Sequence, residues 1–242
     1  MQDTGKRITR EGLQQPVIIT GDSRVPVFRQ MILGWWARNT RDYPWRRNRT
    51  VYRTLVAEMM LRRTRADQVV PVFCNFLERY PTLSAAASED ASALRTMLWP
   101  LGLMWRIENI ITMVGEAHRR FGDDLPADCN ALKTLSGVGD YVAAAVACFA
   151  GGAVLPIIDT NVVRLLGRYF GVDTRGEARR RSDMLDLAHE ALDPNSAADY
   201  NYAVLDFGAC VCIARRPYCA ECPLMAGCMT AVVGAPVIQE TR

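Results

Sequence analysis

The chain has 242 residues, 50% of them hydrophobic and 23% charged, which is typical of a globular protein with one large domain or two small ones. It contains no apolar run of about 18 residues, and its polar start MQDTGKRITREG lacks an apolar signal core. We therefore expect an intracellular protein without a membrane span. The net charge of +3 says little, but the 29 basic residues include only two lysines, Lys6 and Lys133. Arginine suits bidentate phosphate contacts, although a compositional bias of the genome explains the same excess.

Helical patterns follow one another along almost the whole chain. Residues 1–26 have no clear period and predict an N-terminal arm, and RDYPWRRNRT (41–50) predicts a basic loop. Apolar spacing and capping signals predict helices over 27–39, two segments of 51–80 that break near 63–66, a segment ending at Pro100, and 104–121. Further helices are expected over 128–134, 140–150, 160–170, 176–191 and 199–208. Strand signals are almost absent, so the predicted class is all-α.

The order of these helices predicts two lobes. One holds residues 51–158, including a hairpin at 128–150. The other combines 27–50 with 159–230 and contains a cysteine-rich loop at 210–228, and 231–242 form a tail. A cleft between two lobes is the default place for a site.

Two helices within the first lobe are joined by the tight turn LSGVG. Glycine at positions 137 and 139 allows positive φ and a bare backbone, so amide N–H groups and the positive end of the next helix are open to a phosphate. A turn without any ligand is the simpler alternative for G-x-G alone. The longer pattern L-x-G-V-G-x-Y-x-A-A, followed by FAGGAVLPIIDTN, resembles the helix-hairpin-helix of the endonuclease III superfamily of DNA glycosylases.

That resemblance implies roles for particular residues. Leu135, Gly137, Val138 and Gly139 would bind the DNA backbone, and Asp159 would be the catalytic carboxylate that stabilises positive charge on the sugar. Without the resemblance, Asp159 is better explained as only the N-cap of the helix that follows it.

Four cysteines are spaced as Cys212-x6-Cys219-x2-Cys222-x5-Cys228. Four thiolates can hold a zinc ion or an iron–sulfur cluster, and the donor set does not separate the two. The spacing is similar to the C-terminal loop of the same superfamily, which implies a structural 4Fe–4S cluster beside basic residues, Arg215 and Arg216, that meet DNA. The extra Cys210 is expected in the core.

Tyr141 and Glu58 bear on the mechanism. Bifunctional members carry a lysine at the position of Tyr141, so the resemblance implies a monofunctional glycosylase, without efficient lyase activity, that uses water as its nucleophile. Glu58 lies in LVAEMMLRRTR, which resembles S-E-V-M-L-Q-Q-T of the adenine glycosylase MutY and T-E-I-L-L-R-R-T of archaeal mismatch thymine glycosylases. There it would face the base pocket and share a proton with the leaving base. The alternative is an ordinary ion pair with Arg62.

Base removal requires the nucleotide to leave the stack, and something must fill the gap. By resemblance Arg62, Arg63 and Leu103 are candidate wedge residues, the alternative for the arginines being phosphate contacts. Removal of thymine or uracil opposite guanine is the preferred function. Adenine removal opposite 8-oxoguanine or guanine is one alternative, which Glu58 and PWR support, but only 14 residues follow Cys228, too few for the domain that reads 8-oxoguanine. A non-catalytic DNA-binding iron–sulfur protein is the other. The expected partners are double-stranded DNA that contains a mismatched or damaged base, and an AP endonuclease that takes the abasic product. We expect a monomer that acts in the cytoplasm, at the nucleoid.

Overall fold

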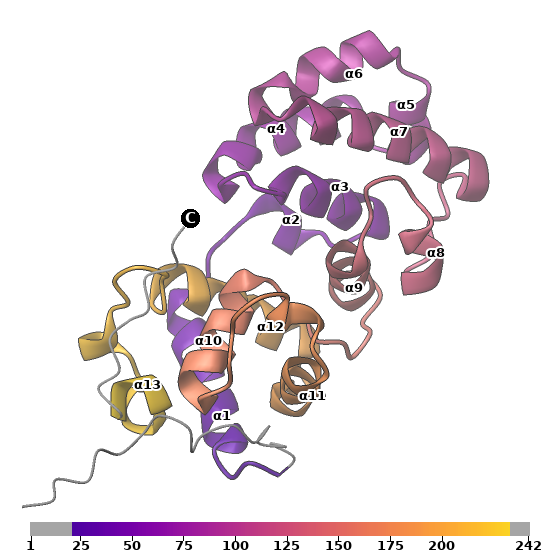
Figure 1. The fold of residues 1–242 in the computed structure, drawn as a ribbon. Coiled ribbons are helices and arrows are strands. Elements are labelled where there is room, and N and C mark those ends of the chain that lie inside the picture. The colour runs from indigo at the N-terminus through magenta and orange to yellow at the C-terminus, as the bar shows by residue number, and fades with distance from the viewer. Residues whose placement is uncertain (1–20, 233–242) are drawn as a thin grey trace, which may run out of the picture.

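The computed structural model describes residues 21–232, which form helices and turns and no strand within that range (Figure 1). The all-α prediction is confirmed. The α-helices, in chain order, are α1 (Val25–Asn39), α2 (Pro44–Arg47), α3 (Val51–Leu61), α4 (Ala66–Arg79), α5 (Leu83–Ala87), α6 (Ala91–Leu98), α7 (Met104–Phe121), α8 (Cys129–Lys133), α9 (Asp140–Phe149), α10 (Thr160–Phe170), α11 (Ser182–Ala191), α12 (Ala197–Cys210) and α13 (Met229–Val232). None of the helices described here is both long and apolar enough to cross a membrane.

The helices form two lobes (Figure 1), each with its own hydrophobic core. The first is built from residues between Trp45 and Val146, with the apolar faces of α3, α4 and α7 at its centre. The second joins the start of the chain to its end, because α1 packs on α12, and α12 on α10. The lobe limits expected at residues 50 and 158 stay a prediction. Close to these limits, Trp45 belongs to the first core and Ile157 to the second.

Four features differ from the sequence-based expectations. The basic loop at 41–50 contains the short helix α2, because Pro44 occupies its first turn and Trp45 is buried. The helix expected from residue 176 begins at Ser182, since Arg181 is extended with ψ of 142°. Cys210 is exposed and not in the core, because it is the last residue of α12, beyond the buried stretch that ends at Gly208. Helix α5 had no counterpart among the predicted elements; the Thr82 side chain caps it by accepting from Ala85 N–H.

Helix α9 connects the two lobes. It packs on α3 in the first lobe and on α12 in the second. Its first-turn residue Tyr141 is partly buried and contacts both cores. Tyr141 therefore lies at the junction of the two lobes, where the candidate site is built.

Candidate active site

The glycine turn follows α8 and opens α9. Gly137 has φ of +76°, and a Cβ there would come within 3.0 Å of both Asn109 Cβ and Met59 Cε. Gly139 has φ of −97° and is the N-cap of α9, where no described side chain caps the helix and a Cβ would meet open space. Leu135 and Val138 are buried, so their side chains anchor the turn and only their backbone can face a ligand. The turn thus presents bare backbone at the open end of α9.

These two glycines are expected to respond differently to alanine. Gly137→Ala forces a left-handed residue and a close contact, and should lower the free energy of unfolding by about 1–2 kcal/mol. Gly139→Ala should leave stability within about 1 kcal/mol and weaken DNA binding, because its methyl group occupies the space before the helix N-terminus. Thermal melts and fluorescence anisotropy with an undamaged duplex measure the two effects. Equal loss of stability in both variants would contradict the assignment.

Glu58 lies on α3 and is only 5% exposed. Burial raises the pKa of its carboxyl from 4.5 to about 7, helped by the charge of Asp159 and opposed by Arg46 and by a hydrogen bond from the Tyr141 hydroxyl. It does not form the surface ion pair with Arg62 that the sequence allowed. Near neutral pH, Glu58 therefore exists in both protonation states and can give or take a proton.

Tyr141 lies beside Glu58 and within the field of Asp159. Burial and the nearby carboxyls of Glu58 and Asp159 raise the pKa of Tyr141 well above its ordinary value. Its hydroxyl is therefore neutral and acts as a hydrogen-bond donor. The three residues predicted from the sequence to take part in the chemistry thus lie together at the junction of the lobes.

Asp159 is the N-cap of α10. Its Oδ1 accepts from Val162 N–H at 2.8 Å, and its Oδ2 accepts from Asn161 Nδ2 at 2.7 Å. Arg164 in turn donates to Asn161 Oδ1 at 2.9 Å and to the Cys212 carbonyl oxygen at 2.9 Å. The carboxylate is fixed in orientation, and a chain of hydrogen bonds joins it to the cysteine loop. Neither Asn161 nor Arg164 was singled out from the sequence.

Arg46, from the segment predicted as a basic loop, is a further charged neighbour of the site. Its two Nη atoms donate to the two carboxylate oxygens of Asp206 at 2.7 and 2.9 Å, across the junction of the lobes. The guanidinium also lies 4.3 Å from the centroid of the Tyr202 ring. Asp206 is 1% exposed, so this ion pair is shielded from water and rigidly placed.

The three candidate wedge residues occupy two adjacent turns. Arg62 is partly buried and donates to the Gly137 carbonyl oxygen at 2.8 Å, with its guanidinium 5.1 Å from the centroid of the Trp105 ring. Arg63 is exposed, and Leu103 is 42% exposed. Arg63 and Leu103 therefore reach solvent, whereas Arg62 ties its own turn to the glycine hairpin.

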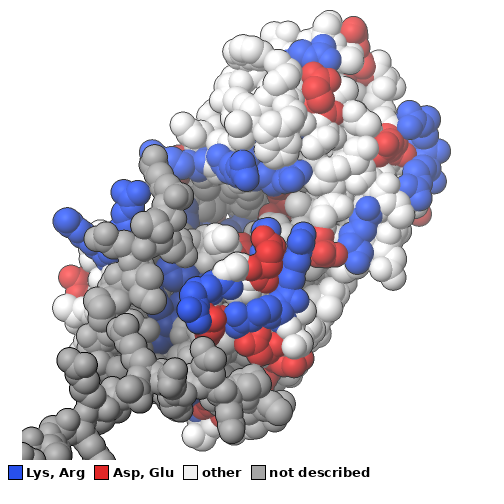
Figure 2. All heavy atoms as spheres, in the orientation of Figure 1, with Lys and Arg blue, Asp and Glu red and all other residues white. Residues whose placement is uncertain are grey.

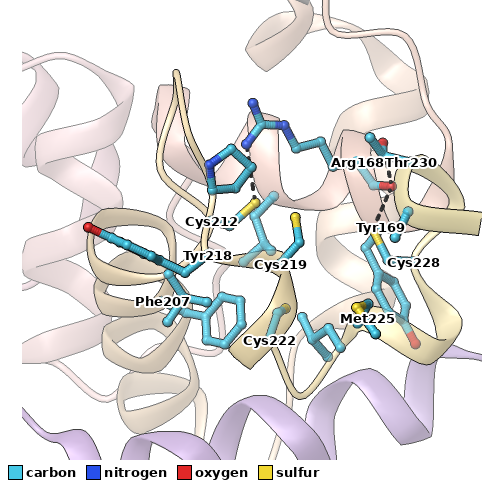
Figure 3. Close-up of a pocket in the computed structure, with 15 residues that line it drawn as sticks. Arg168, Tyr169, Phe207, Cys212, Tyr218, Cys219, Cys222, Met225, Cys228 and Thr230 are labelled. Atoms are coloured by element: carbon cyan, nitrogen blue, oxygen red, sulfur yellow. Dashed lines mark hydrogen bonds between the residues drawn. The ribbon is translucent and has the colours of Figure 1, made fainter. Parts of the chain in front are cut away.

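The four cysteines of the 6-2-5 pattern line one cavity of about 330 Å³ (Figure 3). The cavity also contains Arg168, which donates to Cys212 Sγ at 3.5 Å and to the Ile213 carbonyl oxygen at 2.8 Å. Among the described residues, no three acidic, histidine or cysteine side chains converge closely enough to hold a single metal ion. One zinc ion requires four sulfurs at about 2.3 Å from a common point. Four thiols from one loop line this cavity, so the donor chemistry fits a thiolate-bound centre, either a zinc ion or an iron–sulfur cluster.

Basic side chains gather on both sides of the hollow between the lobes (Figure 2). This charge distribution favours a polyanion at the junction that holds Glu58, Tyr141 and Asp159.

A second cavity, of about 360 Å³, lies elsewhere, between the hairpin and α11. Its lining includes Cys129, Lys133, Asp140, Leu155 and His189, and none of the residues predicted for the site.

Solved structures with the same fold identify the class. A thermostable thymine-DNA glycosylase superposes with a TM-score of 0.82 at 29% identity, over 87% of this chain and 97% of that one. Endonuclease III trapped on DNA gives a TM-score of 0.76 at 18% identity, over 88% and 98% of the two chains. Two helical lobes with a glycine hairpin at their junction thus have the fold of helix-hairpin-helix DNA glycosylases.

Curated relatives agree with this class. The chain is 36% identical over 207 residues to a thymine-DNA glycosylase of Aeropyrum pernix, covering 83% of this chain and 92% of the relative. It is 35% identical to a thymine/uracil-DNA glycosylase of Pyrobaculum aerophilum, over 81% and 88%. An adenine DNA glycosylase of Mycolicibacterium smegmatis is 35% identical, over 80% of this chain and 66% of its own length. No family model matches the chain. The chain belongs to the endonuclease III superfamily of DNA glycosylases.

Proposed function

We propose that this glycosylase hydrolyses the N-glycosidic bond of thymine or uracil mispaired with guanine in double-stranded DNA. The observation that carries the proposal is the junction of the lobes, where Glu58, Tyr141 and Asp159 interact beside the glycine hairpin. The relatives named thymine or thymine/uracil glycosylases, at 30–36% identity, support this choice of base.

Each residue has a part in the proposed reaction. The hairpin backbone from Leu135 to Gly139 holds a phosphate, and the target nucleotide leaves the stack. Protonated Glu58 gives its proton to the departing base, while the fixed Asp159 carboxylate stabilises the cationic sugar. Water then attacks the sugar and yields an abasic site. That product is a substrate for an AP endonuclease, and the reaction fits a monomer that acts at the nucleoid.

A panel of duplexes tests the base. Duplexes containing G·T, G·U, A·G or A·8-oxoguanine are incubated with the enzyme and then cleaved with alkali. We expect strand breaks from G·T and G·U. Breaks confined to the adenine mispairs would establish the adenine glycosylase alternative, which the relative of M. smegmatis supports. Binding without any excision would establish the non-catalytic alternative.

The monofunctional mechanism makes a separate prediction. Because Tyr141 has no amine, the enzyme should release the base without nicking the strand, and borohydride should trap no covalent adduct. Tyr141→Lys places an amine beside Asp159 and should yield a trappable adduct, whereas Tyr141→Phe should not. Denaturing gels of borohydride-treated reactions measure both. An adduct with the unmodified enzyme would refute the proposed mechanism.

We further propose that Cys212, Cys219, Cys222 and Cys228 hold a 4Fe–4S cluster, whose contribution is to order the C-terminal loop. The purified enzyme should then be brown, with visible absorption. Cys212→Ser should abolish the colour, because one ligand of the cluster is lost. It should also reduce excision, because a loop without its cluster no longer holds in place the Cys212 carbonyl that anchors Arg164 and, through Asn161, the carboxylate of Asp159. Cys210→Ser is the matched control, since this nearby thiol is exposed and outside the pattern. A colourless protein that contains one zinc per chain would contradict the cluster.

A further inference from the structure

Arg106 on α7 is the largest of the fully buried side chains, with 0% exposure. No carboxylate in the described part of the chain pairs with it, and burial lowers the pKa of its guanidinium. Burying a charge without an opposite charge is costly and requires other partners. The Nη atoms find them in the carbonyl oxygens of Met60, Arg62, Leu101 and Gly102 and in the hydroxyl of Thr64.

These acceptors come from two different turns. Nη1 serves the end of α3 and the turn that follows it, with bonds to Met60 O at 3.1 Å and Thr64 Oγ1 at 2.6 Å and one to Arg62 O. Nη2 serves the turn before α7, with a bond to Gly102 O at 3.0 Å and one to Leu101 O. One planar guanidinium therefore ties together two turns that lie about 40 residues apart in the sequence.

Both turns have a residue in an unfavourable conformation. Within residues 21–232, the non-glycine residues with positive φ are Arg63, at 58°, and Leu103, at 59°. A side chain in this left-handed region is strained, and the strain persists only where the surroundings hold it. Arg106 holds the peptide carbonyl that immediately precedes each of them, Arg62 O and Gly102 O. The φ of a residue depends on the orientation of the peptide that precedes it, so holding this carbonyl holds φ.

The two strained residues are also the ones that reach solvent. Arg63 and Leu103 are exposed, while Arg62 beside them donates to the Gly137 carbonyl of the hairpin. We propose that Arg106 is a positioning residue, which fixes Arg63 and Leu103 as a paired wedge at a set distance from the DNA-backbone hairpin. This role rests on the proposed base excision, and it assigns to Arg106 the step in which the target base is kept out of the stack.

The test separates base extrusion from bond cleavage. Single-turnover excision is measured on two duplexes, one with a G·U mispair and one with the same uracil opposite a tetrahydrofuran abasic analogue, which offers no base pair to break. Arg106→Met should lower the rate on G·U by roughly 100-fold and the rate on the second duplex by less than about threefold. Arg106→Lys keeps the charge but cannot fork between the turns, so it should show the same ratio with a smaller loss.

Arg29→Met is the matched control, because Arg29 on α1 likewise donates to backbone carbonyls, those of Glu190 and Ala191, away from both turns. Its melting temperature should fall while the ratio of the two rates stays that of the unmodified enzyme. If the Met variant of Arg106 does not fold, the Lys variant provides the ratio. Equal losses on both duplexes, or full G·U activity in a folded variant, would overturn the positioning role. Failure of the unmodified enzyme on both duplexes would instead overturn the proposed function.

Discussion

Asp159→Asn is expected to lower the single-turnover rate of excision by about 10³-fold with little change in stability or DNA affinity. In the proposed reaction the carboxylate stabilises the positive charge that develops on the sugar, and a neutral amide cannot stabilise that charge. Asparagine is as good an N-cap as aspartate, so the bond to Val162 N–H that begins α10 is retained. The variant therefore separates the two roles that the sequence could not distinguish.

The matched control is Asp90→Asn, which makes the same chemical change at the N-cap of α6, in the lobe that lacks Asp159. It should change stability by a similar small amount and leave excision unaffected. Thermal melts, anisotropy with a G·U duplex and quenched-flow rates give the three readouts. Full excision by Asp159→Asn would reduce this residue to a helix cap.

Glu58→Gln should lower excision by roughly 10²-fold or more and remove the dependence of the rate on pH near 7. Burial raises the pKa of Glu58 to about 7, so the unmodified enzyme has its proton donor below that pH and loses it above. Its rate should fall as pH rises through about 7. Glutamine keeps the shape of the side chain and cannot donate a proton to the leaving base. Glu78→Gln, on the exposed side of α4, is the control.

Glu58→Gln should lower activity but raise stability at alkaline pH. Because the folded-state pKa of Glu58 is raised from 4.5 to about 7, the folded protein binds this proton more tightly than the unfolded chain. Its contribution to stability is full below pH 4.5 and is lost as pH rises to about 7, a change of about 3 kcal/mol. At pH 8 Glu58→Gln should therefore melt at a higher temperature than the unmodified enzyme. Equal melting temperatures at that pH would contradict a raised pKa of the buried Glu58 carboxyl.

The parts of this molecule that could be predicted from the sequence are those encoded by contiguous residues. The hairpin glycines, Asp159 and the four cysteines each lie in a short segment whose spacing has a direct physical meaning. Helices were predictable for the same reason. Helix α2 was missed because the burial of Trp45 in the first core outweighs a local loop signal.

Residues that act through distant partners could not be predicted in this way. Arg46 stands in a run of arginines, which ordinarily face water, and only its partner Asp206, 160 residues later, makes it part of the site. Arg106 did leave a signal, since it occupies an apolar position in the 106, 110, 113, 117 series of α7. A lone cation in such a series indicates a buried charge, but not which carbonyls it will meet.

The division of the chain between the two cores sets an order of assembly. The buried residues of the first core all lie between Trp45 and Val146, so this stretch can begin to fold before the second lobe has been synthesised. Helix α1 must wait for α12, since it packs on a partner made some 160 residues later. Glu58 comes from the first lobe and Asp159 from the segment that completes the second. In the proposed mechanism the growing chain therefore acquires its proton donor early and its catalytic carboxylate later, and a half-made chain cannot excise a base.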